Sequence, residues 1–119
     1  SMTSTLAVLA QEPGRHVAVL GEMRELGEFS DRLHAELAAP IMAASVETVI
    51  LVGKAMAPLA ATLEQKVNIV HVPDAAAARD ALTAALRPGD AVLIKGSNGV
   101  GLSSVVAHLN ASRQLAEAR

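Results

Sequence analysis

The stretch Val92-Leu-Ile-Lys-Gly-Ser-Asn-Gly-Val-Gly101 passes from an apolar run through a glycine-rich turn into a second apolar pattern. The first part predicts a buried strand, and the apolar spacing over residues 102–109 predicts a helix behind it. A strand that runs through glycines into a helix brings free backbone N–H groups, a helix N-terminus and Lys95 to one point. This combination suits an anionic group.

Outward from this stretch, short apolar runs alternate with helical patterns along the whole chain. The runs occupy residues 16–20, 48–52, 67–72 and 91–94, and the helical patterns occupy residues 3–11, 30–44, 55–63 and 75–86. Three of the four runs are apolar nearly throughout, as in parallel strands that are covered on both faces. The pattern predicts one α/β three-layer domain with a mainly parallel sheet of at least four strands, in which the first and last strands can lie side by side.

Two helices carry specific signals at their ends. Ser30 can cap the helix over residues 30–44, and Pro40 should kink or split that helix. Asp74 is predicted to cap the helix over residues 75–86. Asp90 follows Pro88 and Gly89 and is predicted to be an ordinary turn residue.

The composition excludes several classes of function. The 119 residues carry a net charge of −2, with no basic stripe and one aromatic residue, Phe29, so nucleic-acid binding is not expected. The chain has no cysteine, which excludes disulfides and thiolate metal sites and fits a cytoplasmic protein. No apolar run approaches the roughly 20 residues that span a bilayer, so no membrane insertion is expected.

Polar side chains follow each predicted strand, where ligands of open α/β sheets bind. They are Glu22, Arg24 and Glu25 after the first strand, Lys54 after the second, His71 and Asp74 near the end of the third, and Lys95, Ser97 and Asn98 after the fourth. Parallel strands would bring these groups to one edge. Each also has a structural reading, since His71 can be a surface residue and the stem of Lys95 can carry its charge to solvent.

Familiar nucleotide motifs do not fit the glycine-rich turn. A P-loop has its lysine after the glycines, but Lys95 precedes them. A dinucleotide fingerprint follows the first strand of a βαβ unit and not the last one. No Ser/His/Asp or Cys/His nucleophile arrangement and no metal-type histidine spacing stands out. We therefore expect a binding half-site, with no catalytic residue and no metal ligand in this chain.

Two signatures resemble the C-terminal domain of the Mur ligases. Val17-Ala-Val-Leu-Gly-Glu-Met-Arg-Glu-Leu-Gly-Glu28, followed by Ser30 and Leu33-His34, is similar to V-L-G-D-M-x-E-L-G. Arg87-Pro-Gly-Asp-Ala-Val-Leu-Ile-Lys-Gly-Ser-Asn-Gly-Val-Gly101 is similar to K-P-G-D-x-V-L-x-K-G-S-R-G-M. The resemblance covers residues 6–109, and within the family the two signatures are most similar to those of the member that joins D-alanyl-D-alanine to UDP-N-acetylmuramoyl-tripeptide.

The resemblance implies that residues 1–119 are the third, Rossmann-like domain of a three-domain enzyme. The central ligase domain, in cis, would carry the P-loop and hold ATP and magnesium. The full enzyme would form an acyl-phosphate that the incoming amine attacks, a step in peptidoglycan precursor synthesis and thus in cell wall biogenesis, cell shape and cell division. This chain alone would be inactive.

Site residues carry over from the family signatures one by one. Lys95, Gly96, Ser97 and Asn98 match the loop expected near the incoming dipeptide, and Glu22 stands where the family has an Asp that faces the nucleotide. Arg24 could reach a phosphate on domain closure. Glu22 is one methylene longer than Asp, and Asn98 replaces an Arg.

A second interpretation stays open from the residues alone. The chain could be a stand-alone, non-enzymatic α/β module that binds a small anion or a nucleotide. The encoding frame upstream would distinguish the two, because only the ligase needs a P-loop segment there.

Overall fold

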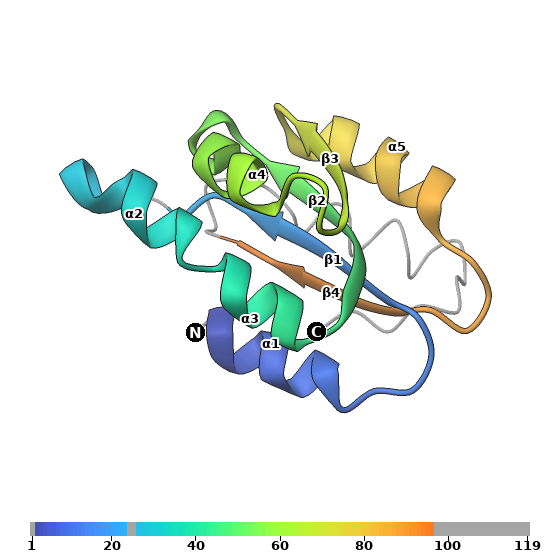
Figure 1. Cartoon of the computed structure of the whole chain (residues 1–119). Coiled ribbons are helices and arrows are strands. Elements are labelled where there is room, and N and C mark those ends of the chain that lie inside the picture. The colour runs from blue at the N-terminus through green and yellow to red at the C-terminus, as the bar shows by residue number, and fades with distance from the viewer. Residues whose placement is uncertain (1, 24–25, 97–119) are drawn as a thin grey trace.

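A computed structural model describes residues 2–23 and 26–96, which form a four-stranded parallel sheet between helices (Figure 1). In chain order the elements are α1 (Met2–Ala10), β1 (His16–Gly21), η1 (Gly27–Phe29), α2 (Ser30–Ala35), α3 (Ala38–Ala43), β2 (Val46–Val52), η2 (Lys54–Met56), α4 (Ala57–Leu63), β3 (Asn68–Val72), α5 (Ala75–Ala85) and β4 (Ala91–Lys95). The predicted α/β class and the parallel sheet are confirmed. The helix predicted over residues 102–109 lies outside the described residues.

The strand order is β3-β2-β1-β4, so the first and fourth strands pair as the sequence suggested. The chain builds the sheet outward from β1 through β2 to β3, and then returns along α5 to place β4 on the other side of β1. The register aligns the strand ends: Gly21 lies opposite Val52, and Leu20 lies opposite Lys95. All four carboxyl ends therefore reach the same edge.

Alternate side chains of the strands enter two separate cores. Val17 and Val19 point to the face that α5 covers, where they join Ala78 and Leu82. Ala18 and Leu20 point to the opposite face, which α1, α3 and α4 cover (Figure 1). This is the three-layer arrangement that nearly continuous apolar strands require, since both of their faces are buried.

The helical pattern over residues 30–44 forms two helices, α2 and α3, and Pro40 explains the split. Proline has no N–H to offer the carbonyl of Glu36, and its ring excludes that carbonyl from a helical position, so the break falls just before Ala38. The predicted Ser30 cap is wrong. The turn η1 leads directly into α2, and Ser30 already has helical torsion angles, φ −54° and ψ −51°, which a capping residue does not have.

The predicted cap of α5 is confirmed. Asp74 has an extended backbone, and its Oδ1 accepts a hydrogen bond from the N–H of Ala77 at 2.9 Å. Asp90, in contrast, does more than form a turn. It is buried, and its carboxylate accepts hydrogen bonds from Arg15 Nε at 2.9 Å and Nη2 at 2.6 Å, and from the Arg87 N–H at 2.8 Å.

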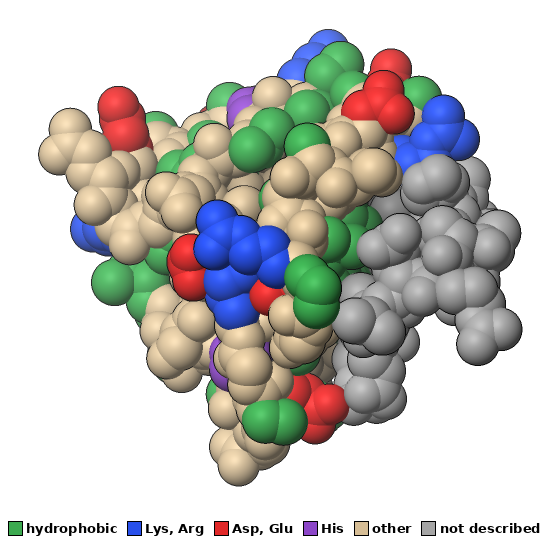
Figure 2. Space-filling model, turned by 90° about the vertical axis from the view of Figure 1, so that its right-hand side faces the viewer, with side chains coloured by type: hydrophobic (Ala, Val, Ile, Leu, Met, Phe, Trp, Pro, Cys, Tyr) green, Lys and Arg blue, Asp and Glu red, His purple; other side chains and the backbone are tan. Residues whose placement is uncertain are grey.

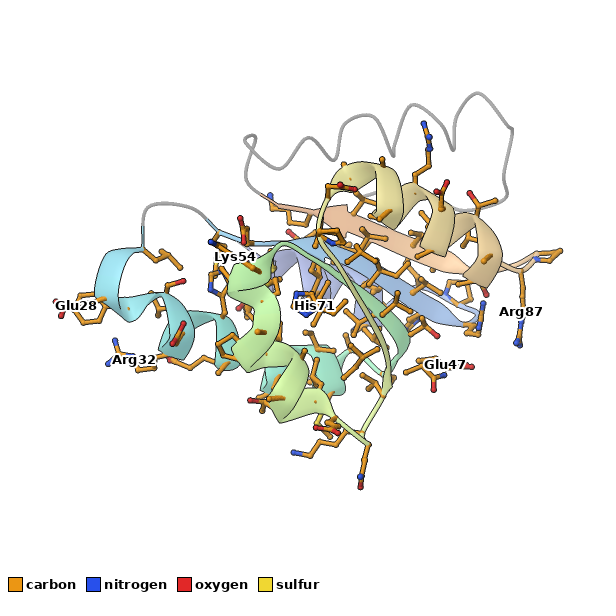
Figure 3. The ribbon with its side chains drawn as sticks, turned by 90° about the horizontal axis from the view of Figure 1, so that it is seen from above. Glu28, Arg32, Glu47, Lys54, His71 and Arg87 are labelled. Atoms are coloured by element: carbon orange, nitrogen blue, oxygen red, sulfur yellow. The ribbon has the colours of Figure 1, made fainter. Side chains whose placement is uncertain are left out.

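This ion pair ties the start of β1 to the start of β4 across 75 residues of sequence. The hydrogen bonds from Arg15 hold the pKa of Asp90 below its ordinary value, against the effect of burial, and the pKa of Arg15 is raised in turn. Figure 2 looks onto this amino end of the strands, where basic and acidic side chains gather near the centre of the face. In Figure 3, Glu47 and Arg87 lie at this end.

Within residues 2–23 and 26–96, no helix combines the length and the apolar character that crossing a membrane requires.

Candidate functional site

A hollow of about 390 Å³ lies where β1, β2 and β3 end. Its walls are formed by Glu22, Gly53, Lys54, His71, Val72 and Pro73. Lys54 is exposed, and Figure 3 shows it away from the end that carries Glu47 and Arg87. The predicted convergence of strand-end groups is therefore confirmed for Glu22, Lys54 and His71, whereas Asp74 is used as a helix cap.

Gly53 lets the carboxylate of Glu22 lie directly against the exit of β2. The Glu22 N–H donates to the Val52 carbonyl at 3.0 Å, and the Ala55 N–H donates to Glu22 Oε2 at 2.9 Å. Gly53 has a φ of +105°, and a Cβ at this position would overlap the Glu22 carboxylate. Glycine is required here both for the left-handed backbone and for the close approach.

His71 supports the same turn from the third strand. Its Nε2 donates to the carbonyl of Gly53 at 2.7 Å, while the N–H of Gly53 donates to the Val72 carbonyl at 2.9 Å. His71 therefore has a structural role in this turn. Backbone hydrogen bonds fix the wall of the hollow: Glu22 is bonded to Val52 of β2, and Gly53, next to Lys54, is bonded to Val72 of β3.

Sequence patterns alone do not assign His34 to this region. It is fully buried in α2, and its Nε2 accepts a hydrogen bond from the N–H of Met23 at 2.8 Å. A signal was present, because His34 precedes the apolar Leu37 and Ile41 at helical spacing and therefore shares their buried face. A buried imidazole needs partners for its nitrogens, but the sequence could not show which they are.

Lys95 and Gly96, the two described residues of the loop that the signatures single out, lie at the end of β4, on the other side of β1 from β2. Lys95 is exposed and pairs with Leu20 in the register, and Gly96 follows it half-buried. Because its ammonium group reaches solvent, the position of Lys95 incurs no burial cost, and burial gives no argument for a functional charge there. Arg24, Ser97 and Asn98 lie outside the described residues.

The chemistry of this edge is that of binding. Ammonium groups on Lys54 and Lys95 attract phosphate or carboxylate, and the carboxylate of Glu22 is an acceptor for hydroxyl groups. Among residues 2–23 and 26–96, no three His, Asp or Glu side chains are grouped in a way that could hold a metal ion.

Comparison with known proteins connects this geometry to a family. The family described as Mur ligase, glutamate ligase domain, matches residues 1–98. The chain belongs to the Mur ligase family. The resemblance of its two signatures to a Mur ligase C-terminal domain is thereby confirmed.

Mur ligases from several bacteria show how much of an enzyme this chain represents. The UDP-N-acetylmuramoyl-tripeptide–D-alanyl-D-alanine ligase of Synechocystis is 36% identical over 92% of the chain and 24% of the relative. That of Mycobacterium leprae is 40% identical over 76% of the chain and 19% of the relative. The MurF ligase from Thermotoga maritima, solved in complex with ADP, has a TM-score of 0.68 at 25% identity, over 87% of this chain and 23% of that one.

The chain thus spans about a quarter of the length of the Mur ligases it matches. Its sheet and helices have the arrangement found in the Thermotoga enzyme.

Proposed function

We propose that this chain is the C-terminal domain, residues 1–119, of a three-domain ligase that adds D-alanyl-D-alanine to UDP-N-acetylmuramoyl-tripeptide. The observation that carries the proposal is the match to a ligase of that name over 92% of the chain. The match extends over both signatures, and no comparison favours a stand-alone binding module. Peptidoglycan precursor synthesis in the cytoplasm belongs to this proposal.

The chain would supply contacts, and another domain would supply the bond-making chemistry. ATP would transfer its γ-phosphoryl group to the tripeptide carboxylate, giving an acyl-phosphate and ADP. The amine of D-alanyl-D-alanine would then attack the acyl carbon, lose a proton and displace phosphate as the amide bond forms. Magnesium and the P-loop would be held by the central domain. The ADP complex of the Thermotoga relative supports nucleotide use in the proposed full-length enzyme.

On this proposal, two sets of residues at the carboxyl edge contact substrates when the domains close. Lys95, Gly96, Ser97 and Asn98 bind the carboxylate end of the dipeptide, and Glu22 and Arg24 bind the nucleotide. The place of Lys95 at the carboxyl end of β4 supports the first role, because it puts an ammonium group at the edge where ligands of parallel sheets bind. The fixed Glu22 carboxylate supports the second, because the Ala55 N–H orients it at the rim of the hollow.

Lys95→Ala tests the dipeptide contact in the full-length ligase. We expect the KM for D-alanyl-D-alanine to rise by about tenfold or more, as for loss of a charge-assisted hydrogen bond, with the melting temperature unchanged. Lys66→Ala is the matched control, since Lys66 is an exposed lysine just before β3, at the other edge of the sheet. A fall in melting temperature with unchanged kinetics would show that Lys95 is structural.

The activity itself is tested by product analysis. The full-length protein, incubated with ATP, magnesium, UDP-N-acetylmuramoyl-tripeptide and D-alanyl-D-alanine, should form the nucleotide pentapeptide and release phosphate, as followed by mass spectrometry. The 119-residue chain alone should form none. Turnover by the isolated chain would refute its assignment as a binding domain, and no product from the intact protein would refute the ligase.

A further inference from the structure

The imidazole of His34 holds the backbone at the point where the chain leaves β1. Its Nε2 accepts from the N–H of Met23 at 2.8 Å, so this nitrogen carries no proton. Its Nδ1 donates to the carbonyl of Ser30 at 2.8 Å, with the Ser30 hydroxyl 3.2 Å away. The ring is fully buried, and one tautomer satisfies both nitrogens.

Met23 needs this acceptor because the sheet ends before it. β1 stops at Gly21, and the last of its backbone bonds toward β2 is made by Glu22. An apolar side chain at position 34 would fill the space but leave the Met23 N–H without its acceptor, which is costly in a part-buried position. His34 therefore does more than pack.

Three hydrogen bonds together fix the strand exit. The Glu22 N–H bonds to the Val52 carbonyl, the Glu22 carboxylate accepts from Ala55, and the Met23 N–H bonds to His34. The helix that carries His34 packs against η2, the turn that holds the Glu22 carboxylate. His34 thus fixes the backbone at Met23, directly after Glu22.

We propose that His34 is a positioning residue: it holds the backbone of Glu22 and Met23 in place for the nucleotide contacts of the intact ligase. The inference rests on the proposed function. His34 touches no substrate on this account, and it acts by the hydrogen bond to Met23. Loss of that bond should weaken use of ATP more than use of D-alanyl-D-alanine.

Two substitutions test the hydrogen bonds of the two ring nitrogens separately. The amide of glutamine in His34→Gln reaches the place of Nε2 and can keep the bond to Met23. The shorter amide in His34→Asn reaches the place of Nδ1 and can keep only the bond to Ser30. Both remove the ring, so a difference between them reports on the Met23 bond and not on lost volume alone.

His16 provides the matched control. It is also a buried histidine with both ring nitrogens bound to backbone, to the carbonyls of Ala44 and Glu12, each at 2.7 Å. It lies at the amino edge of the sheet, where β1 begins. His16→Gln and His16→Asn should lower the melting temperature without changing the KM for ATP.

The test combines amide hydrogen exchange in the 119-residue chain with kinetics of the full-length ligase. We expect the Met23 amide to exchange about tenfold faster in His34→Asn than in His34→Gln, as for loss of one hydrogen bond. The KM for ATP should rise by about tenfold in His34→Asn and stay within about threefold of the parent in His34→Gln.

Each contrary result would refute one part of the proposal. Equal rates of amide exchange at Met23 in the two His34 variants would show that the hydrogen bond to position 34 does not hold the Met23 backbone. Equal changes in the KM for ATP, or changes that follow the melting temperature as in the His16 variants, would reduce His34 to a structural role. If the unmodified ligase shows no turnover that depends on D-alanyl-D-alanine, the proposed function fails and the positioning role falls with it, whatever the exchange at Met23.

Discussion

At the amino edge of the sheet, the Arg15–Asp90 ion pair joins the start of β1, the end of α5 and the turn before β4. Asp90 accepts from both the Arg15 side chain and the Arg87 backbone, and Arg15 also donates to the carbonyl of Ala85 at 2.6 Å. Glu47 stands further out, 3.6 Å from Arg15 and half-exposed. The inner pair is enclosed and hydrogen-bonded, so removing one partner costs more stability than breaking a surface ion pair does.

Asp90→Asn should therefore destabilise the domain. The substitution removes the charge that Arg15 binds and places an amide N–H₂ against a donor, which should cost roughly 2–3 kcal/mol in the free energy of unfolding. Urea denaturation measures this value. Glu47→Gln is the control, and it should change the same quantity by less than about 0.5 kcal/mol. Equal effects of the two variants would contradict the account.

The pKa of Asp90 predicts how this stability depends on pH. Because the folded pKa lies below the ordinary value of 3.8, the contribution of Asp90 is complete above that value and is lost as pH falls through the folded pKa. The gap in unfolding free energy between the parent and Asp90→Asn should be constant from about pH 7 to 5 and shrink in more acidic solution. Urea titrations at a series of pH values measure the gap, and a gap that persists in strong acid would contradict the ion pair.

At the scale of elements, the turn after β2 depends on Gly53. An alanine there must adopt a φ of +105° and displace the Glu22 carboxylate, so it is disfavoured twice. Gly89 also has a left-handed backbone, with a φ of +88°, but nothing lies within 4 Å of the position that a methyl group would take there. Comparing alanine substitutions at the two glycines therefore distinguishes the cost of backbone strain from the cost of side-chain overlap.

We expect Gly89→Ala to cost about 1–2 kcal/mol for backbone strain alone, and Gly53→Ala to cost at least about 1 kcal/mol more. In a Glu22→Ala background the extra cost should fall, with a coupling of more than about 0.5 kcal/mol. Thermal and urea unfolding measure all four variants. Strict additivity of Gly53→Ala and Glu22→Ala would show that the carboxylate does not lie against Gly53.

The elements themselves could be predicted because their signals are local. Strands with two buried faces read as apolar runs, and Pro40 and Asp74 act on their own helices. The prediction that Ser30 caps a helix was wrong because a 3-10 turn before Ser30 already supplies helical backbone. Apolar spacing does not reveal such a turn.

At the scale of the whole molecule, the sequence also predicted that strand-end groups converge, since that follows from parallel strands alone. The particular bonds could not be predicted. Arg15 meets Asp90 across 75 residues, and the Ala55 N–H meets Glu22 across 33. Such contacts depend on strand order and register. The role of His34 likewise could not be predicted, because it depends on the hydrogen bond from Met23, which only the folded chain brings beside it.

The proposed ligase activity requires the intact protein to accept D-alanyl-D-alanine as its amine. The most direct measurement offers the full-length protein UDP-N-acetylmuramoyl-tripeptide, ATP and magnesium with an equimolar mixture of D-alanyl-D-alanine and single amino acids, and identifies the product by mass. The account predicts a product extended by D-alanyl-D-alanine, and none when ATP is omitted. A product extended by a single amino acid, or no product, would contradict it.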